Sequence, residues 1–169
     1  RSDMLNSENN EILTRVGPGT AMGGLFRHFW QPALLSEELS GPDCPPVRVR
    51  LMGEDFVAFR DSAGRVGLLD SHCPHRLADL YFGRNEEGGL RCVYHGWKFS
   101  VTGEVLDMPS EPSESPMRCN PNVRAKAYSV HEAGGIVWAY LGPVESIPPL
   151  PQMEFMGLPA ANVYASKCL

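Results

Sequence analysis

The chain has 169 residues, with 15 Lys and Arg against 20 Asp and Glu, which gives a formal net charge of −5. This length suffices for one domain with a real hydrophobic core, and the negative charge argues against nucleic acid or an anionic membrane surface as a partner. The longest apolar run, residues 136–141, is too short to cross a bilayer, so we expect a soluble protein without a membrane partner.

Residues 1–24 are predicted to form an N-terminal extension. They are polar at first and then rich in Gly and Pro (VGPGTAMGG), which is typical of an ordered turn. No Gly-Lys-Ser/Thr follows this run, so it does not match a phosphate-binding loop. Residues 25–30 are apolar at helical spacing and end before Pro32, which disfavours helix in the residue ahead of it. We therefore predict a short helix over 25–30 that covers one end of the domain.

From residue 47 onward the hydrophobic pattern changes to the alternation of β-strands. Turns such as 61–64 separate the segments, because their Gly residues adopt positive φ without strain. We predict about seven or eight short strands, of which seven are assigned to residues 47–51, 55–60, 65–69, 97–101, 104–106, 126–130 and 136–141. Such a series predicts an all-β fold of antiparallel strands, either a sandwich or a small barrel, over a domain of residues 25–145.

Residues 146–169 are predicted to lie outside this domain. The segment 143–151 (PVESIPPLP) is extended and stiffened by proline, as in the exit from a domain. The stretch that follows ends without a helix, a cap signal or a polar tail. We therefore expect it to be the start of a further region.

The strongest chemical signal is a pair of Cys-His clusters. Cys73 and His75 form a C-x-H pair, and Cys92 and His95 form a C-x-x-H pair. Structural zinc sites usually pair like with like, as two Cys in one segment and two His in the other, whereas each segment here carries one of each. That arrangement suits a two-iron cluster of the Rieske type, in which two Cys hold one iron and two His hold the other. A zinc-stabilised interaction module remains the alternative.

The sequence around these clusters resembles a known family. CPHR, CVYHGWKF and DMPSEP, together with RVGPGTAMGGLFRHFWQPALLSEEL nearer the start, are similar to the phthalate-dioxygenase-like group of Rieske non-haem iron aromatic-ring-hydroxylating oxygenases. The resemblance implies an N-terminal Rieske domain with two cluster-binding hairpin loops, whose [2Fe–2S] ligands are Cys73, His75, Cys92 and His95. One departure is Leu77, which stands where the family commonly has Gly.

The resemblance also implies partners and a direction of electron flow. A flavin- and iron–sulfur-containing reductase would donate electrons to the cluster. They would leave through His95 for mononuclear Fe(II) in a catalytic domain, which in the family belongs to a neighbouring subunit of a homotrimer. That iron would activate O₂ to hydroxylate or demethylate an aromatic substrate. Arg76, Gly96 and Trp97 would pack and hydrogen-bond around the two ligand loops.

No motif for the mononuclear iron site is present in the sequence. Outside the four ligands the histidines are His28, His72 and His131, each isolated, whereas such a site needs two His and a carboxylate. We therefore expect the chain to relay electrons rather than to oxygenate a substrate itself. A free-standing Rieske-type ferredoxin, which is a carrier rather than an enzyme, is the alternative.

The cysteine count bears on the compartment. If two of the five cysteines hold iron, the other three (Cys44, Cys119 and Cys168) are odd in number and show no framework spacing. We therefore expect a reducing, cytoplasmic environment.

Four basic residues near the ligands allow two opposed interpretations. In the first, they dock an acidic reductase. In the second, they form a solvated face that neighbouring acidic residues balance. The four are Arg76, Arg84, Arg91 and Lys98.

Overall fold

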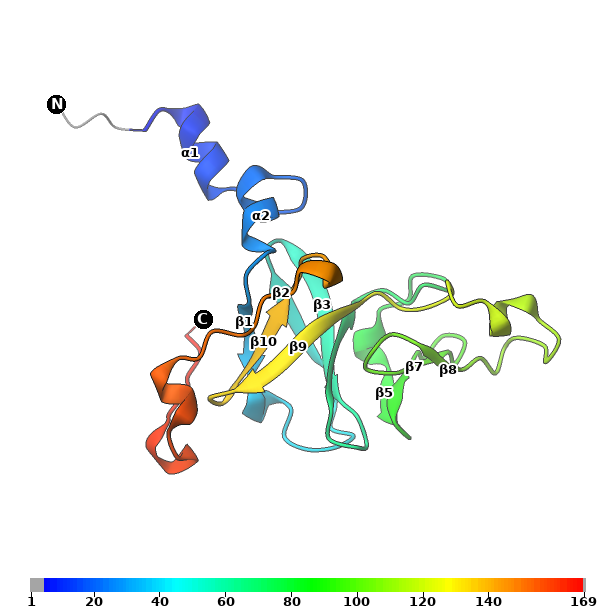
Figure 1. The fold of residues 1–169 in the computed structure, drawn as a ribbon. Coiled ribbons are helices and arrows are strands. Elements are labelled where there is room, and N and C mark those ends of the chain that lie inside the picture. The colour runs from blue at the N-terminus through cyan, green and yellow to red at the C-terminus, as the bar shows by residue number, and fades with distance from the viewer. Residues whose placement is uncertain (1–4, 169) are drawn as a thin grey trace.

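The computed structural model describes residues 5–168, in which ten strands form two antiparallel sheets (Figure 1). The larger sheet has the order β1-β10-β9-β4-β3-β2, and its two end strands approach each other, so it is a nearly closed barrel. Its strands are β1 (Gln31–Leu35), β2 (Val47–Leu51), β3 (Glu54–Arg60), β4 (Val66–Asp70), β9 (Ala127–Ala133) and β10 (Ile136–Tyr140). The smaller sheet runs in chain order through β5 (Arg84–Glu86), β6 (Gly89–Arg91), β7 (Lys98–Phe99) and β8 (Val105–Asp107). The predicted all-β, antiparallel fold is therefore confirmed.

Strand β3 explains how the two sheets are held together. Side chains alternate across a strand, yet every residue from Phe56 to Phe59 is buried. Phe56 and Ala58 point into the barrel core, whereas Val57 and Phe59 contribute to a second core on the outer side of the barrel. Burial of each large side chain stabilises the fold by roughly 1.5–3 kcal/mol, so β3 stabilises both layers at once.

The second core positions the predicted ligand loops. It contains both predicted ligand cysteines together with buried side chains of the small sheet and of β3 and β4: Val57, Phe59, Leu69, Cys73, Leu80, Leu90, Cys92, Trp97, Phe99, Met108 and Ala125. The small sheet thus packs on the barrel with the two cysteines between them. The cysteines are part of the packing as well as candidate ligands.

The N-terminal region contains two α-helices, and the predicted position of one was wrong. Helix α1 (Ser7–Thr14) was not predicted, and helix α2 spans Ala21–Phe26 rather than 25–30. The reason is capping: Thr20 Oγ1 accepts the Gly23 N–H at 3.1 Å, which starts α2 inside the Gly-rich run. The chain then turns through 27–29 and enters β1. Arg27 pairs with Glu54 and so ties α2 to β3.

The predicted strands agree with the structure to within a few residues at each end, and residues 47–51 coincide with β2. Three strands were not predicted. Strand β1 contains Pro32, which is tolerated because β1 lies at the edge of the sheet order and has a bulge beside the proline. Strands β5 and β6 form a tight hairpin inside the spacer between the two Cys-His clusters, with positive φ at Glu87 and Gly88.

Short 3₁₀ turns occupy several connections, and the last two lie in the C-terminal segment. They span Ser36–Glu38, Leu80–Phe82, Pro116–Cys119, Val144–Ser146, Glu154–Gly157 and Ala160–Asn162. None of the helices among residues 5–168 is long and apolar enough to cross a bilayer.

The predicted exit segment folds back on the barrel. The indole N–H of Trp30 donates to the carbonyl of Pro148 at 2.8 Å. The ring of Phe155 lies against Gly134 at the β9–β10 turn, and Lys167 pairs with Glu38 at 2.9 Å. Within the described part of the chain, residues beyond 146 therefore lie against the end of the barrel.

Candidate metal centre

Two loops of matching backbone geometry carry the four predicted ligands. In the first, the Cys73 N–H donates to the carbonyl of Ala78 and the Leu77 N–H donates to the carbonyl of Cys73, both at 2.8 Å. In the second, the Cys92 N–H donates to the Trp97 carbonyl at 2.8 Å and the Gly96 N–H to the Cys92 carbonyl at 3.1 Å. Each cysteine therefore begins a turn closed by two hydrogen bonds at the same relative positions.

The loops differ in how they are attached to the sheets. The second loop joins the paired strands β6 and β7, so it is the tip of a hairpin. The first joins β4 of the barrel to β5 of the small sheet, and an isolated bridge between His72 and Asp79 closes its base. Because β6 packs with its own sheet over the barrel, the two tips meet.

At this meeting point the donors pair by type across the loops. Cys73 and Cys92 are 2% and 3% exposed and belong to the same buried core, where their thiols lie close enough for Cys92 to raise the pKa of Cys73. The rings of His75 and His95 lie 4.6 Å apart between centroids. Thus the structure places sulfur beside sulfur and imidazole beside imidazole, which is the division that a two-iron cluster with Cys₂ and His₂ ends requires.

The donor atoms fit such a cluster. His95 Nδ1 is buried and has no hydrogen-bond partner, and a buried polar atom without a partner is costly unless something binds it. The backbone N–H groups of His75 and Arg76 lower the pKa of the Cys73 thiol and so favour its thiolate form, as expected around a thiolate ligand. Among residues 5–168, no group of three or more His, Cys, Asp or Glu side chains is arranged so that it could hold a single metal ion.

The pKa values of two of the predicted ligands are shifted by this environment. Burial, with the adjacent Cys92 thiol, raises the pKa of the Cys73 thiol to about 11. Burial and the neighbouring His95 ring lower the pKa of His75. At neutral pH the metal-free site therefore holds a protonated thiol and a neutral imidazole, and metal binding would release the thiol proton.

The structure places the three predicted supporting residues in different roles. The Trp97 indole is 1% exposed and stacks on the His75 imidazole, with centroids 4.5 Å apart and planes 3° from parallel. Gly96 has φ +75°, and a Cβ there would lie 2.7 Å from Pro109 Cγ. The Arg76 side chain is exposed, and its contribution to the site is the backbone N–H on Cys73.

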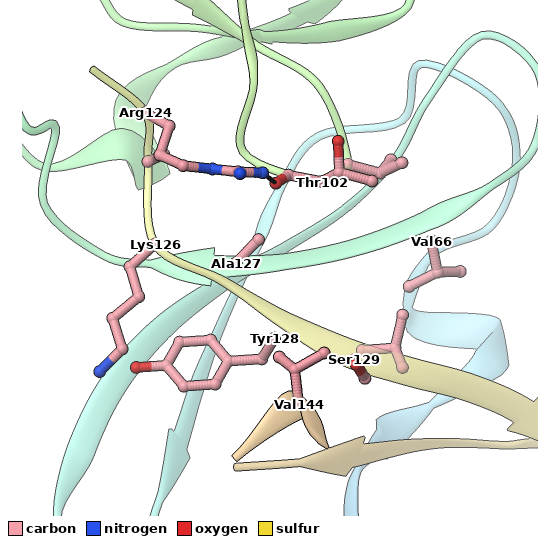
Figure 2. A pocket seen from close by; sticks show the side chains of 11 residues that line it. Val66, Thr102, Arg124, Lys126, Ala127, Tyr128, Ser129 and Val144 are labelled. Carbon is pink, nitrogen blue, oxygen red and sulfur yellow. Dashed lines mark hydrogen bonds between the residues drawn. The ribbon is translucent and has the colours of Figure 1, made fainter. Parts of the chain in front are cut away.

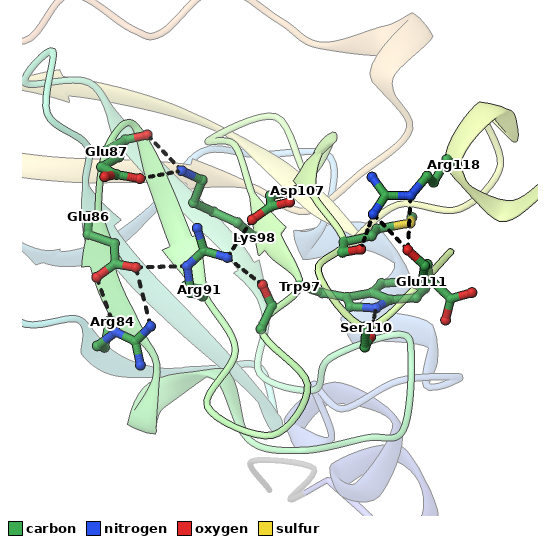
Figure 3. A network of polar contacts seen from close by, with 12 residues as sticks. Arg84, Glu86, Glu87, Arg91, Trp97, Lys98, Asp107, Ser110, Glu111 and Arg118 are labelled. Carbon is green, nitrogen blue, oxygen red and sulfur yellow. Dashed lines mark hydrogen bonds and ion pairs between the residues drawn. The ribbon is translucent and has the colours of Figure 1, made fainter. Parts of the chain in front are cut away.

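Several contacts around the loops were not predicted from the sequence. Figure 3 shows Arg91 bound to both Glu86 and Asp107, and Ser110 accepting the Trp97 indole N–H at 3.1 Å. The Tyr94 ring lies 3.9 Å from that of His95. A buried indole N–H needs an acceptor, so Trp97 alone could have indicated a partner such as Ser110.

The basic residues near the site divide into two groups. Arg91 and Lys98 are nearly buried and paired, with Lys98 held by the Glu87 carboxylate and carbonyl at 3.2 Å (Figure 3). Arg76 and Arg84 are exposed. Two of the four docking candidates are therefore held in ion pairs away from solvent, and of the other two only Arg84, paired with Glu86, fits a solvated face balanced by acidic residues.

A groove of about 650 Å³ lies elsewhere, beside β9 (Figure 2). Valine side chains line it together with Lys126 and Tyr128, and Arg124 Nη2 donates to the Thr102 carbonyl at its rim. None of the four predicted ligands lines this groove.

Comparison with known proteins identifies the family to which the chain belongs. The family described as Rieske [2Fe-2S] domain matches residues 29–129. The chain is 51% identical over 160 residues to the 3-chlorobenzoate-3,4-dioxygenase oxygenase subunit of Comamonas testosteroni, covering 95% of this chain and 36% of that protein. It is 53% identical over 145 residues to the phthalate 4,5-dioxygenase oxygenase subunit of Pseudomonas putida, covering 86% and 33%.

A solved structure shows the same architecture. Dicamba monooxygenase with non-heme iron and dicamba superposes with a TM-score of 0.67 at 26% identity, over 76% of this chain and 38% of that one. The chain therefore spans about a third of the length of the relatives that it matches. The resemblance indicated by the sequence motifs is confirmed.

Proposed function

Because this chain belongs to the Rieske [2Fe–2S] domain family, we propose that Cys73 and Cys92 hold one iron of a [2Fe–2S] cluster and that His75 and His95 hold the other. The observation that carries this assignment is the buried, unpartnered Nδ1 of His95, which lies beside the ring of His75. The paired thiols of the two cysteines supply the other half of the ligand set.

When bound, the cluster supplies one-electron redox chemistry. The chain's residues orient the ligands and limit the access of water. Both cysteines lie in the second core, Trp97 stacks on the His75 ring, and the backbone N–H groups of the first loop favour the thiolate form of Cys73. The His95 ring as a whole is half-buried, and we assign it as the point where electrons leave this domain.

The wider proposal is that the chain relays electrons within an oxygenase. The relatives are named as oxygenase subunits acting on 3-chlorobenzoate and on phthalate, which supports an aromatic substrate for the whole protein. A flavin- and iron–sulfur-containing reductase would be the donor. Mononuclear non-haem Fe(II) in a catalytic domain, of a neighbouring subunit in a homotrimer, would be the acceptor. Cys44, Cys119 and Cys168 are free thiols, in keeping with a reducing cytoplasm.

The alternative of a free-standing ferredoxin has less support. The matched relatives are oxygenase subunits about three times as long as this chain, and the alignments to the two named above cover 95% and 86% of it, beyond the Rieske match itself.

The alternative of a zinc site also has less support. Thiol lies beside thiol and imidazole beside imidazole in two separate contacts, which favours two irons over one zinc.

The ligand assignment is tested by absorption and EPR spectroscopy of the purified protein before and after dithionite reduction. We expect a red-brown protein with a rhombic signal at low average g. The variants Cys92→Ser and His95→Ala should lose it, whereas Cys119→Ser and His131→Ala should keep it, because those two side chains are exposed and belong to neither loop. A colourless, zinc-loaded protein would overturn the assignment.

The relay is tested in the full-length protein with its reductase and O₂. We expect turnover of a chlorobenzoate- or phthalate-like acid that is lost in His95→Ala and retained in His131→Ala. Normal turnover in His95→Ala would refute the proposed electron exit.

A further inference from the structure

Arg91 makes a set of contacts that no other side chain near the candidate metal centre makes. Its Nε donates to Glu86 Oε1 at 2.7 Å, and its Nη1 donates to Asp107 Oδ2 at 2.8 Å and to the Gly96 carbonyl at 2.7 Å. The side chain is only 13% exposed. One guanidinium thus joins β5, β8 and the ligand loop at the residue that follows His95 (Figure 3).

The strand register places Arg91 between two other positive charges, which by itself destabilises the small sheet. Arg91 lies directly opposite Arg84 on one side and Lys98 on the other, and like charges opposite one another across strands repel. Three acidic side chains compensate: Glu86 and Asp107 bind Arg91, and Glu87 binds Lys98. An apolar residue would avoid the repulsion, but it could not donate a hydrogen bond to the Gly96 carbonyl.

The contact with Gly96 reaches the ligands through the backbone. The Gly96 N–H donates to the Cys92 carbonyl, and the Cys92 N–H donates to the carbonyl of Trp97. Fixing the Gly96 carbonyl therefore fixes the turn that contains Cys92 and His95. The first loop has the same backbone turn, and there no side chain donates to the equivalent carbonyl of Leu77 among the described residues.

We propose that Arg91 is a positioning residue that clamps the second ligand loop and thereby sets the direction of His95 Nδ1 relative to the first loop. The inference rests on the proposed cluster site and extends it to a residue that is not a ligand. Arg91 acts through the planar fork of the guanidinium, which binds two carboxylates and a carbonyl in fixed directions. Its charge alone does not provide this.

Three variants separate geometry from charge. Arg91→Met removes both, Arg91→Lys keeps the charge but not the fork, and Arg84→Met is the matched control. Arg84 is an arginine on the neighbouring strand that also binds Glu86, at 3.1 Å, but it is 61% exposed and has no contact with Gly96. Asp107→Ala, which frees one side of the clamp, serves if Arg91→Met does not fold.

The readouts are the EPR line width, the rate of iron release to a chelator, and hydrogen exchange of the Gly96 amide in the metal-free chain. In Arg91→Met we expect broadened EPR lines, since His95 would adopt a range of geometries, roughly tenfold to a hundredfold faster iron release, and faster exchange at Gly96. Arg91→Lys and Asp107→Ala should be intermediate, and Arg84→Met should match the unmodified protein.

Two results would overturn the inference. Arg91→Lys behaving as the unmodified protein in all three measurements would mean that charge suffices. Arg91→Met behaving as Arg84→Met would mean that the clamp does not reach the ligands. Failure of the cluster assignment itself is distinguishable, because the unmodified protein would then lack the Rieske EPR signal.

Discussion

The two ligand loops share one backbone design but are supported differently. Each begins at a cysteine and is closed by two backbone hydrogen bonds at equivalent positions. The residue four beyond each cysteine has positive φ, namely Leu77 at 57° and Gly96 at 75°. The next residue is Ala78 in the first loop and Trp97 in the second.

The difference lies in what surrounds each turn. The second loop contains the buried Trp97, is clamped by Arg91 and packs against Pro109. The first loop has the exposed Leu77 at its tip, 72% accessible, in a conformation that a side chain disfavours. The second loop therefore has more supporting contacts than the first, and Trp97 links the two loops by stacking on His75.

Removal of the Trp97 ring should have the largest effect, because it breaks this link between the loops. Trp97→Ala should lower the free energy of unfolding by about 3–5 kcal/mol and deplete the cluster. Trp97→Phe keeps an aromatic ring but loses the N–H bound to Ser110, so we expect a loss of about 1–2 kcal/mol. Urea unfolding and iron content provide the measurements. Equal losses for the two variants would show that stacking contributes nothing.

Gly96→Ala tests the packing of the second loop. Alanine at positive φ costs about 1–2 kcal/mol, and its Cβ would also lie 2.7 Å from Pro109 Cγ. The matched control is Gly88→Ala, with φ +81° and no atom within 4 Å of the added Cβ. Urea unfolding should show a larger loss for Gly96→Ala, and the difference measures the contact with Pro109. Identical losses of unfolding free energy would mean that the loop accommodates the added Cβ at no energetic cost.

Leu77→Gly should have the smallest effect, and its sign should be opposite. Relief of the left-handed backbone is worth about 1–2 kcal/mol, and the added freedom of glycine in the unfolded chain takes back about 0.5–1 kcal/mol. We therefore expect a gain of about 1 kcal/mol or less in urea unfolding. Leu77→Ala, which keeps the strain, should show no gain. Destabilisation by Leu77→Gly would mean that the exposed leucine side chain makes a stabilising contact.

Local patterns in the sequence determined much of this protein. The alternation of residues 47–51 predicted β2, and the spacing of the two Cys-His clusters selected the four candidate ligands. Both features extend over only a few residues, and the direction of side chains over such distances follows from the backbone period. The predicted helix over 25–30 was misplaced, because the cap at Thr20 outweighed the apolar pattern in setting where the helix begins.

Tertiary structure alone decided how the loops meet. That Cys73 lies beside Cys92, that Trp97 covers His75, and that Arg91 binds Asp107 all depend on which strands pair and how the small sheet packs on the barrel. Sequence spacing carries no such information, because partners far apart in the chain are brought together by burial of shared apolar surface. The candidate ligands could therefore be proposed from the sequence, but the contacts that surround them could not.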